Sequence, residues 1–206
     1  MTATTVAPED GRLARSARTR AAVIDALLGL HLDGDLSPTA GRVAQRAGVA
    51  LRTVYGHFAD LESLYAEAGQ RALEHCRELA LAATADVTPD LPLEVRARRF
   101  AAARAQVLEW LLPISQAAAL REGISPQMQR NRQRFVASGD REVRRLFAPE
   151  LSRLDRAARD RALDSLHVVA GGPAWSALRQ DRGLGPATAA ALLGDLVVGT
   201  AQAVLL

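Results

Sequence analysis

Four side chains that can donate hydrogen bonds lie in one short stretch of the sequence: Arg52, Thr53, Tyr55 and His57. Hydroxyl, imidazole and guanidinium groups bind phosphate oxygens, and a guanidinium can also donate two bonds to one guanine base. The chemistry that this spacing favours is therefore recognition of a nucleic acid. That chemistry requires elements that hold the four side chains on an exposed face.

Residues 37–58 have the features of two short crossing helices, a helix-turn-helix. Ala44 is small enough for the crossing, and Gly48, four positions later, can adopt the positive φ that the turn needs. The second helix, over 51–57, is too short to be stable without packing, and its remaining side chains would be free to enter a major groove. Apolar positions that would hold both helices are Val43, Ala47, Val49, Val54 and Phe58.

An ordinary helical hairpin explains these apolar positions equally well. Ala and Gly recur at this spacing by chance in a chain that is rich in alanine. The exposed donors favour DNA binding over the plain hairpin, because a hairpin has no need of them. Both interpretations stay open at this point.

The segment resembles the signature of the tetracycline-repressor (TetR) family of transcriptional regulators. The resemblance covers residues 18–65, and it includes a run in the first helix. The matching residues in that helix are Arg20, Ile24, Asp25 and Ala26, and those beyond it are Thr39, Val43-Ala44, Arg46-Ala47-Gly48-Val49, Thr53-Val54-Tyr55, His57-Phe58 and Leu64.

The resemblance implies a three-helix DNA-binding head and a larger helical body that dimerises and binds a small apolar or amphipathic ligand. It implies a homodimer on a palindromic operator in double-stranded DNA, acting as a repressor that the ligand releases. Carried over by position, Thr39, Tyr55 and His57 would bind phosphates. The residues that would face bases are Leu51, Arg52, Thr53 and Gly56.

Two positions depart from the family pattern. The recognition helix is preceded by Ala50, where the family commonly has a serine that caps the helix. Leu61 stands where the family usually has a lysine that reaches phosphate. Its absence should lower the dependence of affinity on salt by about one unit of slope.

The composition fits a helical protein with a substantial core, since 49% of the 206 residues are hydrophobic and the net charge is only +3. All 26 basic residues are arginine. A single cysteine, Cys76, excludes an internal disulfide, and Cys and His are too sparse for a structural zinc site. The N-terminus lacks the apolar core of a signal peptide, so we expect a soluble cytoplasmic protein.

Periodicity predicts an all-α fold of about nine helices, because strand-like alternation is absent and helix stops recur. We expect a flexible arginine-bearing arm (1–17), a helix-turn-helix domain (18–62) and a ligand-binding and dimerisation body (63–206). Ser37, with Pro38 at the first position, is predicted to cap the second helix. Further helices are expected over 18–32, 60–84, 93–112, 114–122, 126–147, 151–170, 174–179 and 187–206.

The N-terminal arginines allow two interpretations. Arg12, Arg15, Arg18 and Arg20 place four positive charges close together. They could form a solvated tail and first helical turn, or an arm that touches phosphate or the minor groove.

The apolar stretch 187–206 also allows two interpretations. Asp195 near its middle makes a membrane span costly, so we expect a helix that is buried against protein. We expect this helix and the one from Leu151 to pair with their symmetry mates in a four-helix dimer interface.

A ligand pocket in the body is a weaker expectation, because each candidate could be an ordinary core side chain. A ligand there could tilt the helix from Asp60 and change the spacing of the two recognition helices, which must be about 34–36 Å for successive major grooves. The candidates are Gln106, Trp110, Met128, Phe135, His167 and Trp175.

The sequence favours a non-enzymatic protein without a cofactor. It contains no Glu-x-x-His pair of the di-iron type, no glycine-rich phosphate loop and no Gly-x-Ser-x-Gly elbow. Three alternatives stay open beside the ligand-released repressor. They are a regulator without a ligand, an activator, and a helical ligand-binding or interaction module with a degenerate helix-turn-helix.

Overall fold

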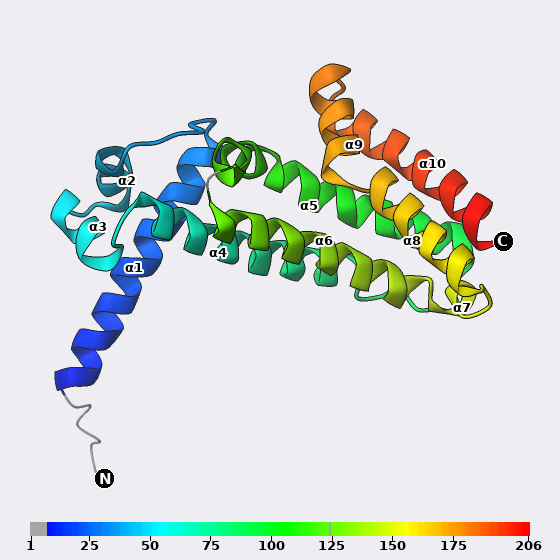
Figure 1. The fold of residues 1–206 in the computed structure, drawn as a ribbon, viewed down its shortest axis with the longest axis horizontal. Coiled ribbons are helices and arrows are strands. Elements are labelled where there is room, and N and C mark those ends of the chain that lie inside the picture. The colour runs from blue at the N-terminus through cyan, green and yellow to red at the C-terminus, as the bar shows by residue number, and fades with distance from the viewer. Residues whose placement is uncertain (1–7, 124) are drawn as a thin grey trace, which may run out of the picture. The chain divides into compact units, whose positions relative to one another are not determined.

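The computed structural model describes residues 8–123 and 125–206, and throughout these residues the secondary structure is helical with no strand (Figure 1). The prediction of an all-α fold is confirmed. The helices are α1 (Pro8–Leu32), α2 (Ala40–Ala47), α3 (Leu51–His57), α4 (Leu61–Ala83), α5 (Leu93–Glu122), α6 (Pro126–Leu146), α7 (Ala148–Leu151), α8 (Arg156–Val169), α9 (Gly172–Ser176), the π-helical turn η1 (Ala177–Asp181) and α10 (Pro186–Leu205).

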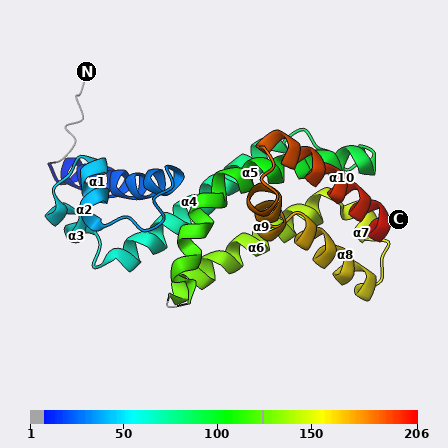
Figure 2. The same ribbon diagram turned by 90° about the horizontal axis from the view of Figure 1, so that it is seen from above.

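The chain divides into two compact units. The first unit comprises residues 1–72 and 113–128, and the second comprises residues 73–112 and 129–206. In the first unit, α1, α2 and α3 pack against one another. In the second unit, α8 and α10 lie side by side, as both views show (Figures 1 and 2).

The core of the second unit is built from α5, α6, α8 and α10. Phe100 on α5 meets Phe147, which follows α6, edge to face at 5.9 Å between ring centroids. α10 contributes Leu193 and Val197, both fully buried, and α8 contributes Leu166. This spacing of three to four residues on α10 produces one inward face, which accounts for its apolar composition.

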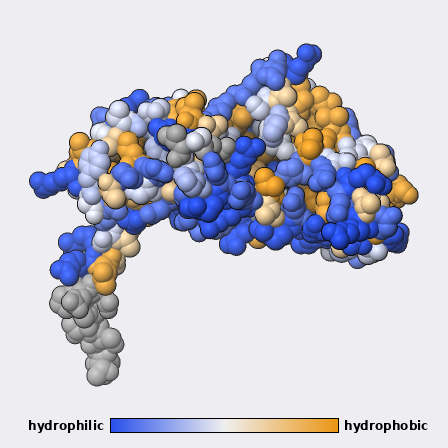
Figure 3. Space-filling view, viewed as in Figure 1, coloured by the Kyte–Doolittle hydropathy of each residue, from blue (hydrophilic) through white to orange (hydrophobic). Residues whose placement is uncertain are grey.

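Within the described residues, α10 has the length and apolar composition that could cross a membrane, and 39% of that apolar window is buried within the chain. Gly185 precedes the helix, as predicted, and Pro186 begins it, one residue before the expected start. The apolar surface over α9 and α10 is visible in Figure 3.

The predicted start of the first helix is wrong. α1 begins at Pro8 rather than Arg18, so the part of the expected arm from residue 8 to 17 is helical, and residues 1–7 lie outside the described residues. Proline at the first helical position followed by Glu9 and Asp10 in the first turn is a helix-start signal that the sequence interpretation overlooked.

The predicted cap of the second helix is also wrong. Thr39 caps α2, its hydroxyl oxygen accepting from the Arg42 N–H at 3.3 Å, whereas Ser37 accepts a hydrogen bond from Arg121 at 3.1 Å. Pro38 therefore lies one residue before the cap and not at the first helical position. A proline also restricts the residue before it, here Ser37, to extended backbone.

The predicted break at Pro113 does not occur, since α5 continues through it to Glu122. Proline removes one backbone hydrogen bond, but Ile114 and Ala117 beyond it are buried, and this packing outweighs the local cost.

Another predicted helix, from Leu151, begins later than expected. α8 starts at Arg156 because Asp155 caps it, accepting from the Ala158 N–H at 2.7 Å.

Candidate nucleic-acid interface

The turn between α2 and α3 has the geometry that the sequence predicted. Gly48 ends α2 at φ +68°, in the left-handed region where a side chain would be strained. Its N–H donates to the Gln45 carbonyl at 3.2 Å, and the Val49 N–H donates to the Ala44 carbonyl at 3.0 Å. These bonds satisfy the end of α2 and direct the chain into α3.

α3 is held by apolar contacts rather than by its own length. Val54 on its inner face and Phe58 just after it are buried, as are Val43 and Ala44 on α2. A seven-residue helix gains little from its own hydrogen bonds, so this packing must stabilise it. The prediction that no side chain caps its N-terminus at Ala50 is confirmed.

The opposite face of α3 meets solvent. Tyr55 is 52% exposed, Leu51, Arg52 and Gly56 are exposed as well, and Thr53 and His57 are partly exposed. Thr39 at the start of α2 is exposed too. The structure therefore places all seven residues that were expected to contact DNA where an external partner could reach them.

Arg52 and Thr39 differ in what they retain for a partner. No ion pair or hydrogen bond joins Arg52 to any of the residues that the structure describes, so its five N–H donors face water. The Thr39 hydroxyl accepts the bond from Arg42, but its own hydrogen stays available for donation to a phosphate.

Two arginines on α2 are already paired and so contrast with Arg52. Arg42 forms an ion pair with Asp35 at 2.6 Å, and Arg46 forms one with Asp33. The Arg46 guanidinium lies directly over Gly29 of α1, where a Cβ atom would stand 2.7 Å from one of its nitrogens. These contacts fix α2 to the end of α1.

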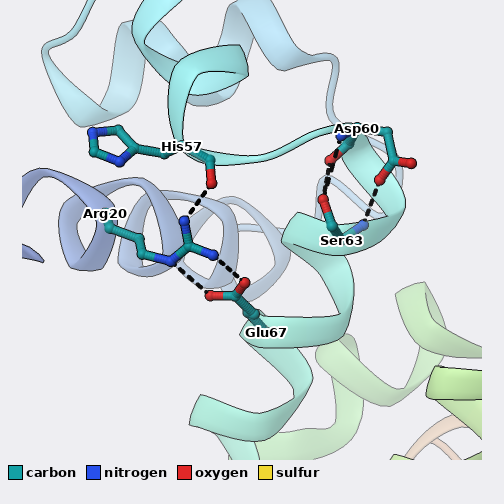
Figure 4. A network of polar contacts seen from close by, with 5 residues as sticks. All are labelled: Arg20, His57, Asp60, Ser63 and Glu67. Atoms are coloured by element: carbon teal, nitrogen blue, oxygen red, sulfur yellow. Dashed lines mark hydrogen bonds and ion pairs between the residues drawn. The ribbon is translucent and has the colours of Figure 1, made fainter.

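Arg20 supports the start of α4 and the end of α3 through contacts that the sequence interpretation missed, because Arg20 was grouped with the N-terminal charges. Its guanidinium donates to the His57 carbonyl and to both carboxylate oxygens of Glu67, at 3.0 Å for the Nε bond (Figure 4). It also lies 4.4 Å from the centroid of the Phe58 ring. Arg20 thus joins α1, the end of α3 and α4, whereas Arg12, Arg15 and Arg18 are exposed on α1.

A capping box fixes the start of α4 close after α3. The Asp60 carboxylate accepts from the Ser63 N–H at 2.7 Å, and the Ser63 hydroxyl accepts from the Asp60 N–H at 3.3 Å (Figure 4). The hydrogen bond from the Ser63 backbone lowers the pKa of Asp60. Asp60 is therefore ionised at neutral pH, which suits the N-terminus of a helix.

A buried polar cluster lies behind the loop between α1 and α2. His31 is buried, its Nδ1 lies 2.8 Å from the Asp35 carbonyl, and its ring stacks obliquely on Tyr65. The Tyr65 ring also contacts the Arg121 guanidinium, whose central carbon lies 3.9 Å from the ring centroid. Burial lowers the pKa of His31, with Arg121 acting in the same direction, and burial raises the pKa of Tyr65.

The candidate ligand residues are not brought together as one set. Phe135 and His167 lie in the second unit around Arg104 and Asp140. Gln106 is exposed, so it does not lie on an inner face of this chain, and Met128 is buried in the first unit. Polar residues of α5 alternate with apolar ones, which made the inward face hard to assign.

The two tryptophans occupy separate surroundings within the second unit. The Trp110 ring packs on His75 at 4.4 Å between centroids. Trp175 is buried, and its indole N–H donates to Glu109 at 3.0 Å. Arg179 also donates to Glu109, which lowers the pKa of that carboxyl. Trp175 is thus satisfied inside the fold.

Potential metal ligands are scattered over the part of the chain that the structure describes. In the described ranges, no three His, Cys, Asp or Glu side chains form a group that could hold a metal ion. Cys76 is buried, and burial raises its pKa to about 12, so its thiol stays protonated.

The architecture is a helix-turn-helix set on α1 and a larger all-helical unit. No family model and no curated protein matches the sequence. Solved structures do match. A TetR-family transcriptional regulator from Mesorhizobium loti is 20% identical over 92% of this chain and 98% of its own, with a TM-score of 0.72.

Two further structures agree with this architecture. A TetR-family regulator from Streptomyces coelicolor is 18% identical over 90% of this chain and 80% of its own, with a TM-score of 0.69. The multidrug binding protein EbrR, solved with imidazole, is 21% identical over 86% of this chain and 93% of its own, with a TM-score of 0.54. This chain has the fold of the TetR-family regulators.

Proposed function

We propose that this protein is a sequence-specific DNA-binding transcriptional regulator. The observation that carries the proposal is the two-sided character of α3. Val54 and the adjoining Phe58 are buried, whereas Arg52 and Tyr55 are exposed with hydrogen-bond donors to offer. A short, firmly packed helix with polar donors on its outer face is what a major groove accepts.

The roles of the individual residues follow from their chemistry and exposure. Thr39, Tyr55 and His57 bind phosphates and so position α3 along the duplex. Arg52 reads a guanine with two parallel hydrogen bonds, supported by Leu51, Thr53 and Gly56 at the base edges. The helix-turn-helix domain spans residues 18–62, and the regulatory body spans residues 63–206.

The regulator acts as a homodimer on a palindromic site. Support comes from the outer surface of the α8 and α10 pair, where Val168 is 69% exposed and Leu192 and Leu196 are exposed as well. Two copies of this surface, related by a two-fold axis, would cover these apolar groups and form a four-helix interface. A solution mass of one chain at micromolar concentration would contradict the dimer.

The regulator is a cytoplasmic repressor that a small ligand releases. Support comes from the fold and from EbrR, a multidrug binding protein of the same fold solved with imidazole. A ligand acts only through different affinities for DNA-bound and free forms, so it must bind the second more tightly. Equal operator affinity with and without every ligand tested would favour a regulator without a ligand.

Fluorescence anisotropy tests the function directly. We would compare DNA from the neighbouring promoter with scrambled DNA, using the wild type, Arg52→Ala and the matched control Arg77→Ala, which removes an exposed charge from the second unit. We expect a preference for the promoter that Arg52→Ala reduces and Arg77→Ala retains. Equal, weak binding to both DNAs by the wild type would contradict the proposal.

A further inference from the structure

Helix α5 carries two buried arginines whose surroundings differ. Arg96 is 3% exposed and fully engaged: it donates to the Leu91 carbonyl at 2.8 Å, to the Leu146 carbonyl at 2.7 Å and to both oxygens of Glu150, at 2.9 Å for one of them. It also lies 5.8 Å from the Phe147 ring centroid. Arg96 and Glu150 therefore form a structural ion pair.

Arg104, two turns further along α5, is 7% exposed but lacks a comparable set of partners. Its Nε donates to the Ala170 carbonyl at 3.0 Å, and its guanidinium carbon lies 5.1 Å from the centroid of the Phe135 ring. Across residues 8–123 and 125–206, no carboxylate forms an ion pair or hydrogen bond with it. Burial lowers the pKa of Arg104, although arginine stays charged at neutral pH.

The acidic groups around Arg104 form no ion pair or hydrogen bond with it in the described ranges. Glu142 is the strongest electrostatic neighbour, yet one of its carboxylate oxygens is buried without a hydrogen bond, and burial raises its pKa. Asp140 is partly exposed and pairs with His167 at 3.2 Å. The Cys76 thiol is protonated, as its raised pKa shows. Arg104 is thus a buried cation that no carboxylate of the described residues contacts directly.

A buried charge without a partner is costly, and proteins retain one where a ligand completes the pair. We propose that Arg104 binds the acid group of a small amphipathic organic anion, with Phe135 packing against the ligand's apolar part. A guanidinium presents parallel donors that match the two oxygens of a carboxylate or sulfonate. The inference rests on the proposed ligand-controlled regulator and names the chemical class of its ligand.

The test uses two fluorescent probes that differ in one group. Anilinonaphthalene sulfonate carries an acid group, and N-phenylnaphthylamine is its uncharged counterpart. We expect the wild type to bind the sulfonate more tightly than the neutral probe, by roughly ten- to a hundredfold, the range of a charge-assisted pair of hydrogen bonds. Equal affinity for both probes, or binding of neither, would overturn the inference.

Arg104→Met removes the charge but keeps most of the volume. We expect it to abolish the preference for the sulfonate while leaving the affinity for the neutral probe within about twofold, and to retain or raise the unliganded Tm. Arg99→Met is the matched control, an exposed arginine on the same helix that should change neither affinity. A preference that survives in Arg104→Met would overturn the inference, as would a loss in both variants.

A second variant covers the case in which Arg104→Met does not fold. Glu142→Gln removes the acid with the largest electrostatic effect on Arg104, and it should tighten sulfonate binding without affecting the neutral probe. An unchanged sulfonate affinity would overturn the inference. The DNA anisotropy assay on the same samples separates the two claims. Specific DNA binding without an Arg104-dependent probe preference refutes the ligand class alone, and the reverse result refutes the regulator alone.

Discussion

The two units use the same residue type in opposite settings. In the first unit, Arg20 is engaged by His57 and Glu67, whereas Arg52 faces solvent without a partner in the described structure. In the second unit, Arg96 is engaged by Glu150, whereas Arg104 is buried without a carboxylate partner. In each unit, therefore, an arginine that holds the fold together can be compared with one whose donors do not meet a carboxylate.

The difference between the units lies in the surroundings of the unpartnered arginine. A solvated guanidinium costs nothing to keep and can meet a charged, hydrated polymer such as DNA. A buried guanidinium is costly until a desolvated anion meets it, which suits a small ligand. Variants of the engaged and the unpartnered arginines should therefore separate effects on stability from effects on binding.

Breaking the engaged pair of the second unit should have the largest effect. Arg96→Met leaves the Glu150 carboxylate buried and uncompensated, which should lower the free energy of unfolding by about 3–5 kcal/mol. The double variant with Glu150→Met should recover most of that loss, because neither charge then remains. Urea denaturation measures both. An Arg96→Met protein as stable as the wild type would show that the pair does not hold this unit together.

Breaking the engaged arginine of the first unit should have a smaller effect, since Arg20 is partly exposed. Arg20→Met should lower stability by about 1–2 kcal/mol through the lost charged hydrogen bonds, discounted for solvent screening. DNA affinity should fall because α3 loses its support, but the salt dependence of affinity should stay constant, since no phosphate contact is removed. Arg12→Met, at an exposed position of α1, is the control for stability. A reduced salt slope in Arg20→Met would show that Arg20 contacts DNA itself.

The missing cap of α3 offers a gain in stability. Ala50→Ser would place a hydroxyl where it can accept from the first turn of α3, and it should raise the free energy of unfolding by about 0.5–2 kcal/mol. The control Ala59→Ser, between α3 and α4, should leave the free energy of unfolding unchanged. Thermal denaturation distinguishes the two, and equal Tm values would indicate that another group already satisfies those N–H donors.

The pH dependence of the first unit should depend on His31. Its folded pKa lies below the ordinary 6.5, chiefly because burial disfavours the charged ring, with Arg121 acting in the same direction and Asp35 opposing it. The unfolded chain therefore takes up the proton first, so this contribution to stability is complete above about pH 6.5 and declines as the pH falls. His31→Gln should flatten the Tm between about pH 8 and about pH 5. If the dependence of Tm on pH is the same in His31→Gln and the wild type, groups other than His31 cause it.

The sequence was most informative where local chemistry decides the structure. Gly48 at its turn, the uncapped Ala50 and the outward donors of α3 were all predicted from residue type and spacing. Each of these features depends on a few neighbouring residues. The exposed face of the candidate interface could therefore be assigned before the fold was known.

The sequence was misleading where distant packing decides. Pro113 looked like a helix stop, but burial of residues beyond it continues α5. Arg20 looked like one charge of a basic arm, but its partners lie 37 and 47 positions away. Likewise, Arg96 differs from Arg104 because Arg96 pairs with Glu150, a residue far along the chain.

We propose above all that α3 reads DNA through Arg52. The most direct test of this proposal is the promoter-to-scrambled affinity ratio measured by anisotropy for the wild type and Arg52→Ala at two salt concentrations. We expect Arg52→Ala to reduce the free-energy preference for the promoter by about 1–3 kcal/mol, whereas Arg77→Ala leaves the preference intact. An Arg52→Ala protein with the same ratio as a discriminating wild type would contradict the account.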